Sequence, residues 1–155
     1  MKIAFILIVS LILFMLLYFI YLSIKSHSGI PLGLINQKLS PCPDTPNCIN
    51  SEFKNDTAHF IDALTYQNKS TDEIILATKN AIQKSGGHVT EISNNYISAT
   101  YTSKLFRYID DFEIRIDNEH KAIHFRSASR VGHSDFGANI KRIHLIKNEL
   151  EMQFQ

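Results

Sequence analysis

One uninterrupted apolar run near the N-terminus constrains this chain more than any other feature. Of the 22 residues from Ile3 to Ile24, 20 are hydrophobic or Tyr, and Lys2 is the single charge in residues 1–24. About 20 apolar residues in a helix cross the roughly 30 Å hydrocarbon core of a bilayer. We therefore expect residues 1–24 to be a transmembrane anchor, with residues 3–24 in the lipid bilayer.

Two other interpretations of this run are a cleaved signal peptide and a buried core helix. A cleavable signal has an apolar region of roughly 7–15 residues followed by small residues at the cleavage site. This run is longer, and residues 23–27 contain no Ala-x-Ala, so an uncleaved signal-anchor is favoured, although cleavage stays open.

The flanking charges give only a thin bias in orientation, because Lys2 on one side faces Lys25 on the other. The short N-terminal tail favours an N-terminus inside the cell and residues 25–155 outside. We expect a single-pass protein of the cytoplasmic (inner) membrane, with its globular domain on the periplasmic or extracytoplasmic side of the cell envelope.

The remainder of the chain is electrically neutral. The whole chain carries 16 Lys and Arg against 15 Asp and Glu, and removing Lys2 leaves 15 of each sign. A neutral domain is a poor match for nucleic acid, so we expect no nucleic-acid partner. Residues 25–41 hold two Gly, two Pro and three Ser, which is typical of a linker, and residues 42–155 are long enough for one small domain.

Two helices are expected in that domain. Ser70 and Glu73 form the pattern of a capping box before an apolar stripe, and Gly86-Gly87 would end this helix. A second helix is expected to begin near Ser134-Asp135, because apolar residues recur from Phe136 to Leu150 at three- and four-residue steps.

Runs rich in β-forming residues lie before and between the helices. Strands are expected at 58–66, 88–93, 96–102, 109–117 and 121–127, and Asn94-Asn95 suits a two-residue hairpin loop. The predicted fold class is α+β: an antiparallel sheet packed against two helices, preceded by one N-terminal transmembrane helix.

The alternation of apolar and polar residues predicts a register for the 109–127 hairpin. A two-residue loop at Asn118-Glu119 would place Phe112 opposite Phe125 and Ile114 opposite Ile123. Glu113 would then face His124, and Asp111 would face Arg126. A slip by one residue would pair apolar with polar positions throughout.

Three motifs give the domain a family resemblance. They are CPDTPNC at 42–48, YIDDFE at 108–113 and RSASRVGHSDFGAN at 126–139. The chain resembles the family catalogued as domain of unknown function 1499 over roughly residues 42–150. The resemblance implies a small envelope or plastid-associated domain without an established activity, and it implies no reaction. Ile140 and His144 depart from the basic and acidic residues expected there, which weakens the case for an ionic site on the last helix.

Cys42 and Cys48 would close a small loop, and outside the cytoplasm such a pair tends to oxidise. A structural disulfide is favoured over a redox-active pair or free or metal-bound thiols, since the spacing is not Cys-x-x-Cys. No His pair at ligand spacing accompanies the cysteines, and His120 and His124 would lie about 13 Å apart on a strand. We expect no metal and no cofactor.

The segment 126–139 and its surroundings contain the candidate ligand-binding residues. A functional interpretation gathers them around an anion such as a phosphate, a carboxylate or a lipid headgroup. A structural interpretation uses the same residues differently: Ser134 or Asp135 caps the last helix, Arg126 pairs with Asp111, and Arg130 or Arg142 pairs with Asp110. The candidates are Asp110, Asp111, Arg126, Ser127, Ser129, Arg130, His133, Asp135, Asn139 and Arg142.

Catalysis is the less favoured interpretation, and no catalytic residue is identified. Ser134, His133 and Asp135 are adjacent in sequence, which is not a triad in space, and no nucleophile elbow or phosphate-binding loop is present. The first hypothesis is a non-catalytic binding or structural module in the envelope, with an envelope protein or an anionic small molecule as partner. The alternative is an enzyme or an anion- or headgroup-binding domain that uses Asp110/Asp111, Arg126, Arg130 and His133.

Overall fold

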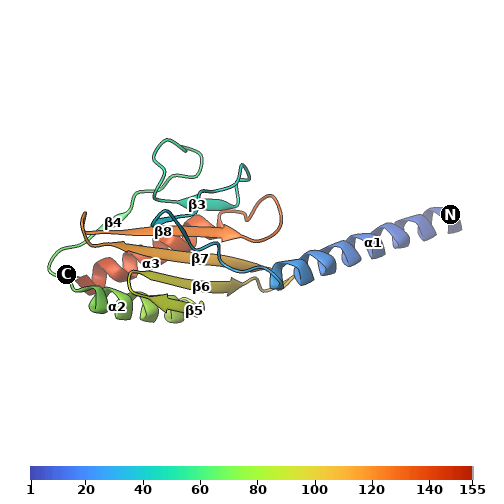
Figure 1. Ribbon diagram of the computed structural model, residues 1–155. Helices are drawn as coiled ribbons and strands as arrows, with labels where there is room; N and C mark the ends of the chain where they lie inside the picture. Colours follow the sequence, from blue (N-terminus) through green and yellow to red (C-terminus); the bar gives the residue numbers. More distant parts are fainter. Residues whose placement is uncertain (155) are drawn as a thin grey trace.

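The apolar run forms one long helix that projects from the rest of the molecule. The computed structural model describes residues 1–154, and in it α1 spans Lys2–His27. Figure 1 shows α1 extending away from the sheet and helices, and its apolar side chains are exposed along most of its length. The helix is long and apolar enough to cross a membrane, which suggests a membrane anchor.

The rest of the chain is built on a six-stranded antiparallel sheet. The strands follow the order β3-β8-β7-β6-β5, and β4 also pairs with β8. This confirms the α+β prediction. The bounds are β3 Cys48–Asn50, β4 Leu64–Thr65, β5 His88–Ser93, β6 Tyr96–Thr102, β7 Ile109–Asp117 and β8 Ala122–Ser129.

The helix α2, Thr71–Lys84, begins and ends as its sequence predicts. The Ser70 hydroxyl accepts a hydrogen bond from the Glu73 amide, and the Glu73 carboxylate accepts one from the Ser70 amide, so the capping box is complete. After the helix, a Cβ at Gly87 would lie only 2.6 Å from the Tyr101 ring. Glycine at 87 therefore lets the chain pass close to the sheet.

The second helix of the domain, α3, spans Ala138–Phe154 and begins later than Ser134-Asp135. Phe136 and Gly137 have φ of 54° and 76°, which is left-handed backbone that cannot belong to an α-helix. The Asp135 carboxylate accepts hydrogen bonds from the amides of Gly137 and Asn139, so it satisfies donors at the start of α3.

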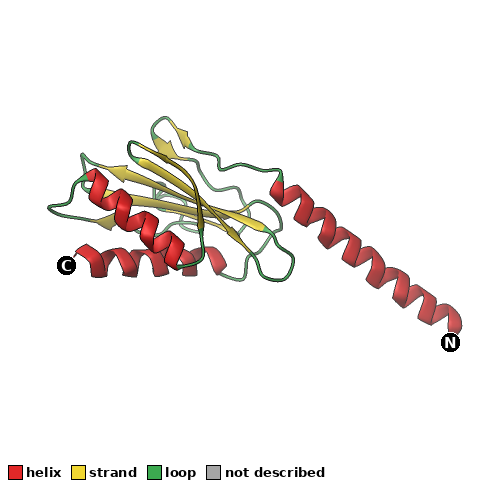
Figure 2. Cartoon of the chain, turned by 90° about the horizontal axis from the view of Figure 1, so that it is seen from below, coloured by secondary structure: helices red, strands yellow, loops and turns green. Residues whose placement is uncertain are grey.

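Both helices lie on one face of the sheet and enclose the hydrophobic core. Figure 2 shows α2 and α3 side by side across this face. Every second residue of the central strands points into this core. Its fully buried members include Phe112, Ile114, Ile123 and Phe125 from the sheet, and Ile74, Ile82, Ile143, Ile146 and Leu150 from the helices.

The predicted register of the β7–β8 hairpin is wrong by two residues. Ile114 pairs with Phe125, Ile116 with Ile123 and Asp117 with Ala122, so the loop has four residues, 118–121. Asp117 Oδ1 accepts hydrogen bonds from the amides of Glu119 and His120, which stabilises this longer turn. A two-residue shift preserves the alternation of faces, so the apolar pattern could not detect it.

Two further segments differ from the sequence prediction. A strand is expected at 58–66 from the sequence. Within this range only the two residues of β4 form a strand, and Phe60 forms a single β-bridge with Asn50. Within the segment expected as a linker, β1 (Leu34–Ile35) and β2 (Lys38–Leu39) form a small antiparallel hairpin. Leu39 is completely buried, so this part of the segment packs against the domain.

The register gives a direct test of the hairpin. We expect the I114C/F125C variant and the I116C/I123C variant to form a second disulfide, because directly opposite residues lie within bonding range. The I114C/I123C variant joins diagonal neighbours and should stay reduced. Mass spectrometry after thiol blocking and proteolysis distinguishes the three variants, and oxidation of I114C/I123C alone would restore the register with the shorter loop.

Candidate functional site

The sequence-predicted site residues fall into two groups on opposite faces of the sheet. Asp110 and Asp111 are neighbours on β7, and successive side chains of a strand point to opposite faces. Asp110 points toward α3, whereas Asp111 points to the face that the chain segment 29–63 covers. The structure therefore does not bring all the candidates together.

On the helix face, Asp110 belongs to a network that joins the sheet to α3. Arg142 Nη2 donates to Asp110 Oδ2 at 2.8 Å, and the Arg142 guanidinium lies 4.2 Å from the centre of the Tyr101 ring. Arg142 is thus the partner of Asp110, which is one of the two pairings proposed from the sequence.

Asn139 is the centre of the same network and is completely buried. Its Nδ2 donates to the Asn47 carbonyl at 2.8 Å and to the Ser129 hydroxyl at 3.2 Å. Its Oδ1 accepts from the Ser127 hydroxyl at 2.6 Å and also from Arg142. These contacts join α3 to β8 and to Asn47, the residue before β3, and they engage the polar atoms that an anion would need.

On the opposite face, two ion pairs lie side by side. Arg130 donates to Asp111 through Nε and Nη2, with a shortest distance of 2.7 Å. Arg126 Nη1 donates to Glu113 Oε2 at 2.7 Å. The expected pairing of Arg126 with Asp111 is therefore wrong, and it is wrong because of the two-residue register shift.

Glu113 is a fully buried carboxylate with three donors. Besides Arg126, it accepts a hydrogen bond from the Tyr96 hydroxyl at 2.8 Å and one from the Gly33 amide at 2.8 Å. Burial, followed by the charge of Glu113, strongly raises the pKa of Tyr96. The Gly33 contact attaches the segment after α1 to the middle of the sheet.

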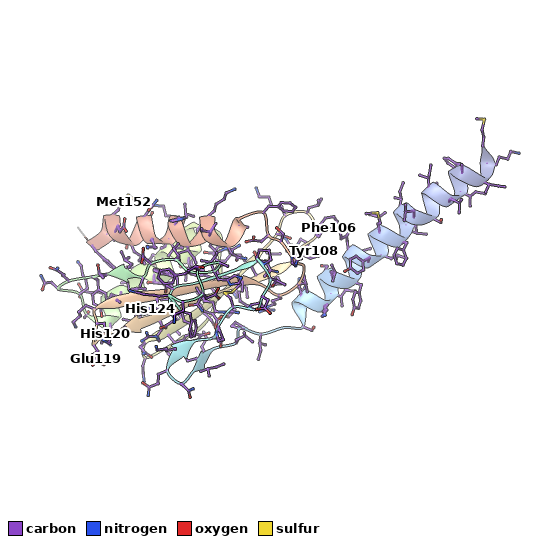
Figure 3. All side chains as sticks on the ribbon, turned by 90° about the horizontal axis from the view of Figure 1, so that it is seen from above. Phe106, Tyr108, Glu119, His120, His124 and Met152 are labelled. Atoms are coloured by element: carbon purple, nitrogen blue, oxygen red, sulfur yellow. A yellow bond between two sulfur atoms is a disulfide. The ribbon has the colours of Figure 1, made fainter. Side chains whose placement is uncertain are left out.

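The same face continues into a second ionic cluster at the far end of β7. Arg115 donates to Glu52 at 2.6 Å and to Asp117 at 3.3 Å. Burial lowers the pKa of His124, which lies 3.8 Å from Glu52. Figure 3 shows His120 and His124 at this end of the domain, away from α1.

A cavity opens beside the first two ion pairs, at the end of the sheet nearer to α1. Its volume is about 480 Å³, which is within the range of small-molecule sites. Asp111, Arg126 and Arg130 line its floor. The covering chain contributes the apolar residues Ile30, Leu32, Pro41 and Pro43.

Arg126 is the one member of these two pairs with a buried nitrogen that makes no hydrogen bond to a described residue. Its side chain is 4% exposed, and its buried Nε has no hydrogen-bond partner among residues 1–154. An unsatisfied buried donor costs about 1–3 kcal/mol. Arg130, in contrast, uses Nε and Nη2 on Asp111 and Nη1 on the Ser26 carbonyl at 3.1 Å. Arg126 therefore lines this cavity and carries a buried donor that no described residue satisfies.

Of the remaining candidates, Ser129 also lines the cavity and the others do not. His133 is exposed on the loop between β8 and α3, so it does not join Arg126 and Arg130. Within residues 1–154, no three His, Cys, Asp or Glu side chains are arranged to hold a metal ion. The disulfide between Cys42 and Cys48 is present, and Cys42 lies at the cavity wall.

Several important residues were missed from the sequence. Glu113 and Arg115 alternate with apolar residues, and Glu52 lies in a loop. Both patterns normally indicate a solvent-exposed side chain. The covering residues Ile30 and Leu32 lie in a segment whose Gly and Pro content indicated a linker. The sequence did contain a signal for the covered face. Four charged residues alternate with apolar ones at 111–117, and the preceding linker contains apolar residues that could cover them.

The Asp111–Arg130 pair makes a prediction about stability. We expect R130A to lower the free energy of unfolding by about 3 kcal/mol, because it leaves the buried Asp111 carboxylate without its partner. Urea denaturation of the full chain in detergent micelles measures this change. K141A, which removes an exposed cation from α3, is the control, and equal stability of both variants would refute a structural role for Arg130.

A second prediction concerns acid. Burial opposes ionisation of Asp117, but hydrogen bonds from His120 and the charge of Arg115 outweigh it and lower the pKa from 3.8 to about 2. The ionised carboxylate therefore stabilises the fold above pH 4, and this contribution is lost as the pH falls from about 4 to about 2. We expect D117N to lose less stability than the wild type over this interval in urea denaturation. Parallel curves would show that Asp117 is not the responsible group.

Comparison with known proteins identifies the domain without identifying a reaction. The search of curated proteins returned no match. The family model described as "Protein of unknown function (DUF1499)" matches residues 38–150, which is most of the chain and includes β2, the disulfide loop, the sheet and most of α3. The chain therefore belongs to the DUF1499 family.

Proposed function

We propose that this protein is a membrane-anchored, non-catalytic binding module whose ligand site is the cavity over Arg126. In this proposal α1 is a single-pass anchor in the cytoplasmic membrane. The domain lies on the extracytoplasmic side, as part of the cell envelope. The Cys42–Cys48 disulfide supports this side, because disulfides persist in oxidising compartments.

The observation that carries the proposal is the unpartnered Nε of Arg126. A folded domain seldom leaves a buried guanidinium nitrogen without an acceptor, since the cost is about 1–3 kcal/mol. In this proposal the Arg126 side chain turns its Nε, which has almost no accessible surface, toward the adjacent cavity, and a ligand oxygen supplies the acceptor. Each guanidinium nitrogen of Arg130, in contrast, already donates to Asp111 or to the Ser26 carbonyl.

The charges and the lining of the cavity limit the class of ligand. The two cations, Arg126 and Arg130, are balanced by Asp111 and Glu113, so the floor carries no net charge to attract a multiply charged anion. The wall formed by Ile30, Leu32, Pro41 and Pro43 is apolar. An amphiphile with an apolar body and an ester, amide or carboxyl oxygen fits this combination.

The location of the cavity supports the same class. Gly29 and Ile30 line it, and they follow the end of α1 at His27 by only a few residues. With α1 in a bilayer, the cavity lies close to the membrane surface. An amphiphile from the membrane could therefore reach it over a short path.

The R126K variant tests the proposal. Lysine retains the charge beside Glu113 but lacks the guanidinium Nε, so we expect occupancy by the bound amphiphile to fall about tenfold. Native mass spectrometry of the full chain, purified from its own membrane into nanodiscs, measures the bound mass. R115K is the matched control, because Arg115 is a buried, ion-paired residue of the same sheet face outside this cavity.

Three results would contradict the proposal. If R126K carries the same bound mass at the same occupancy as the wild type, Arg126 does not bind the ligand. If R115K loses the ligand as completely as R126K, the effect comes from general destabilisation. If the wild type converts the bound molecule into a product of different mass and R126K does not, the domain is an enzyme.

A further inference from the structure

The last turns of α1 are bound to the loop between β6 and β7, residues 103–108. The Phe19 ring stacks on the Phe106 ring with 4.6 Å between their centres, and Phe106 stacks on Tyr108 at 5.5 Å. The Tyr108 hydroxyl lies 3.5 Å from the Phe19 carbonyl, to which it donates. Figure 3 shows Phe106 and Tyr108 at the junction between α1 and the domain.

A second set of contacts fixes the end of α1 to the sheet. Ser26 is completely buried, and its hydroxyl accepts a hydrogen bond from the Ile109 amide at 3.2 Å. Its carbonyl accepts one from Arg130 Nη1 at 3.1 Å. Because β7 begins at Ile109 and Arg130 directly follows β8, α1 is attached to the two central strands and does not act as a free tether.

This attachment determines how deep the loop lies. Phe19 precedes Ile24, the last residue of the apolar run, by five residues, which is about 7.5 Å along a helix. The ring centres of Phe19 and Phe106 are 4.6 Å apart. Even if this whole distance points along the axis of α1 toward its C-terminal end, the Phe106 ring lies about 3 Å deeper in the bilayer than Ile24. The run of 22 residues rises about 33 Å against a core of about 30 Å, so α1 can slide very little.

The composition of the loop suits that depth. Leu105 is 81% exposed, and Lys104 and Arg107 flank the apolar pair Leu105-Phe106 with no acidic residue in 103–108. Basic side chains beside an apolar tip can reach phosphates while the tip enters the acyl region. Phe136, 91% exposed, lies in the loop after β8, which the antiparallel pairing places at the same end of the sheet.

We propose that the β6–β7 loop inserts into the lipid bilayer beside α1, with Leu105 and Phe106 in the acyl region and Lys104 and Arg107 at the phosphates. This inference rests on the membrane anchor of the proposed function. The inserted loop is a second membrane contact, which holds the domain in one orientation and keeps the Arg126 cavity at the bilayer surface. The partner that the β6–β7 loop contacts is therefore lipid.

Single tryptophans can test the insertion, because the natural chain contains no Trp. Four variants of the full chain are reconstituted into phosphatidylcholine–phosphatidylglycerol vesicles, with and without brominated acyl chains. L105W and F106W probe the loop, F14W probes the middle of α1, and F154W probes the end of α3. Leu105 is an exposed position, so L105W tests the loop even if F106W disturbs the aromatic stack.

We expect brominated lipid to reduce the emission of L105W, F106W and F14W by about half and to leave F154W unchanged. Quenching of F14W without quenching of L105W and F106W would overturn the insertion and leave the anchor intact. Absence of quenching in F14W would overturn the anchor and, with it, the insertion. Equal quenching of F154W would show non-specific adsorption and would also refute this orientation.

Discussion

The burial of a charged sheet face beneath the chain that leaves α1 is the constraint on which the rest of this structure depends. Glu113 is fully buried, and it is tolerable there because Arg126, Tyr96 and the Gly33 amide all donate to it. Because one of these donors is the backbone of Gly33, the segment after α1 has to lie across β7. The covering chain, the cavity and the position of α1 follow from this arrangement.

The two faces of the sheet differ in what covers them and in how their polar groups are paired. On the helix face, apolar residues form the core, and the polar network around Asn139 is closed, with partners for Asp110, Arg142 and Ser127. On the covered face, Asp111 and Arg130 attach the sheet to the end of α1. Within residues 1–154, Arg126 alone combines deep burial, a place in the cavity lining and a buried nitrogen without a hydrogen-bond partner. The functional proposal follows from this difference.

Local sequence patterns predicted the elements better than their connections. The capping box at Ser70, the Asn94-Asn95 hairpin and the bounds of β5, β6 and β7 could be predicted, because each depends on neighbouring residues. The register of β7 and β8 could not, since a two-residue shift leaves the apolar pattern unchanged. That shift decides which Arg pairs with Asp111. The pair Asp110–Arg142 was among the sequence candidates, whereas the roles of Glu113 and Ser26 depend on residues some 80 positions apart.

The claim that the covered cavity holds an amphiphile can be tested most directly at Leu32, an apolar residue of its wall. Photo-leucine at position 32 is activated in intact cells, and the purified chain is then analysed by mass spectrometry. A small-molecule adduct that is absent from the same substitution at Leu76, an exposed residue of α2, is the predicted result. No adduct at position 32, or an adduct with a second protein, would contradict a ligand-filled cavity.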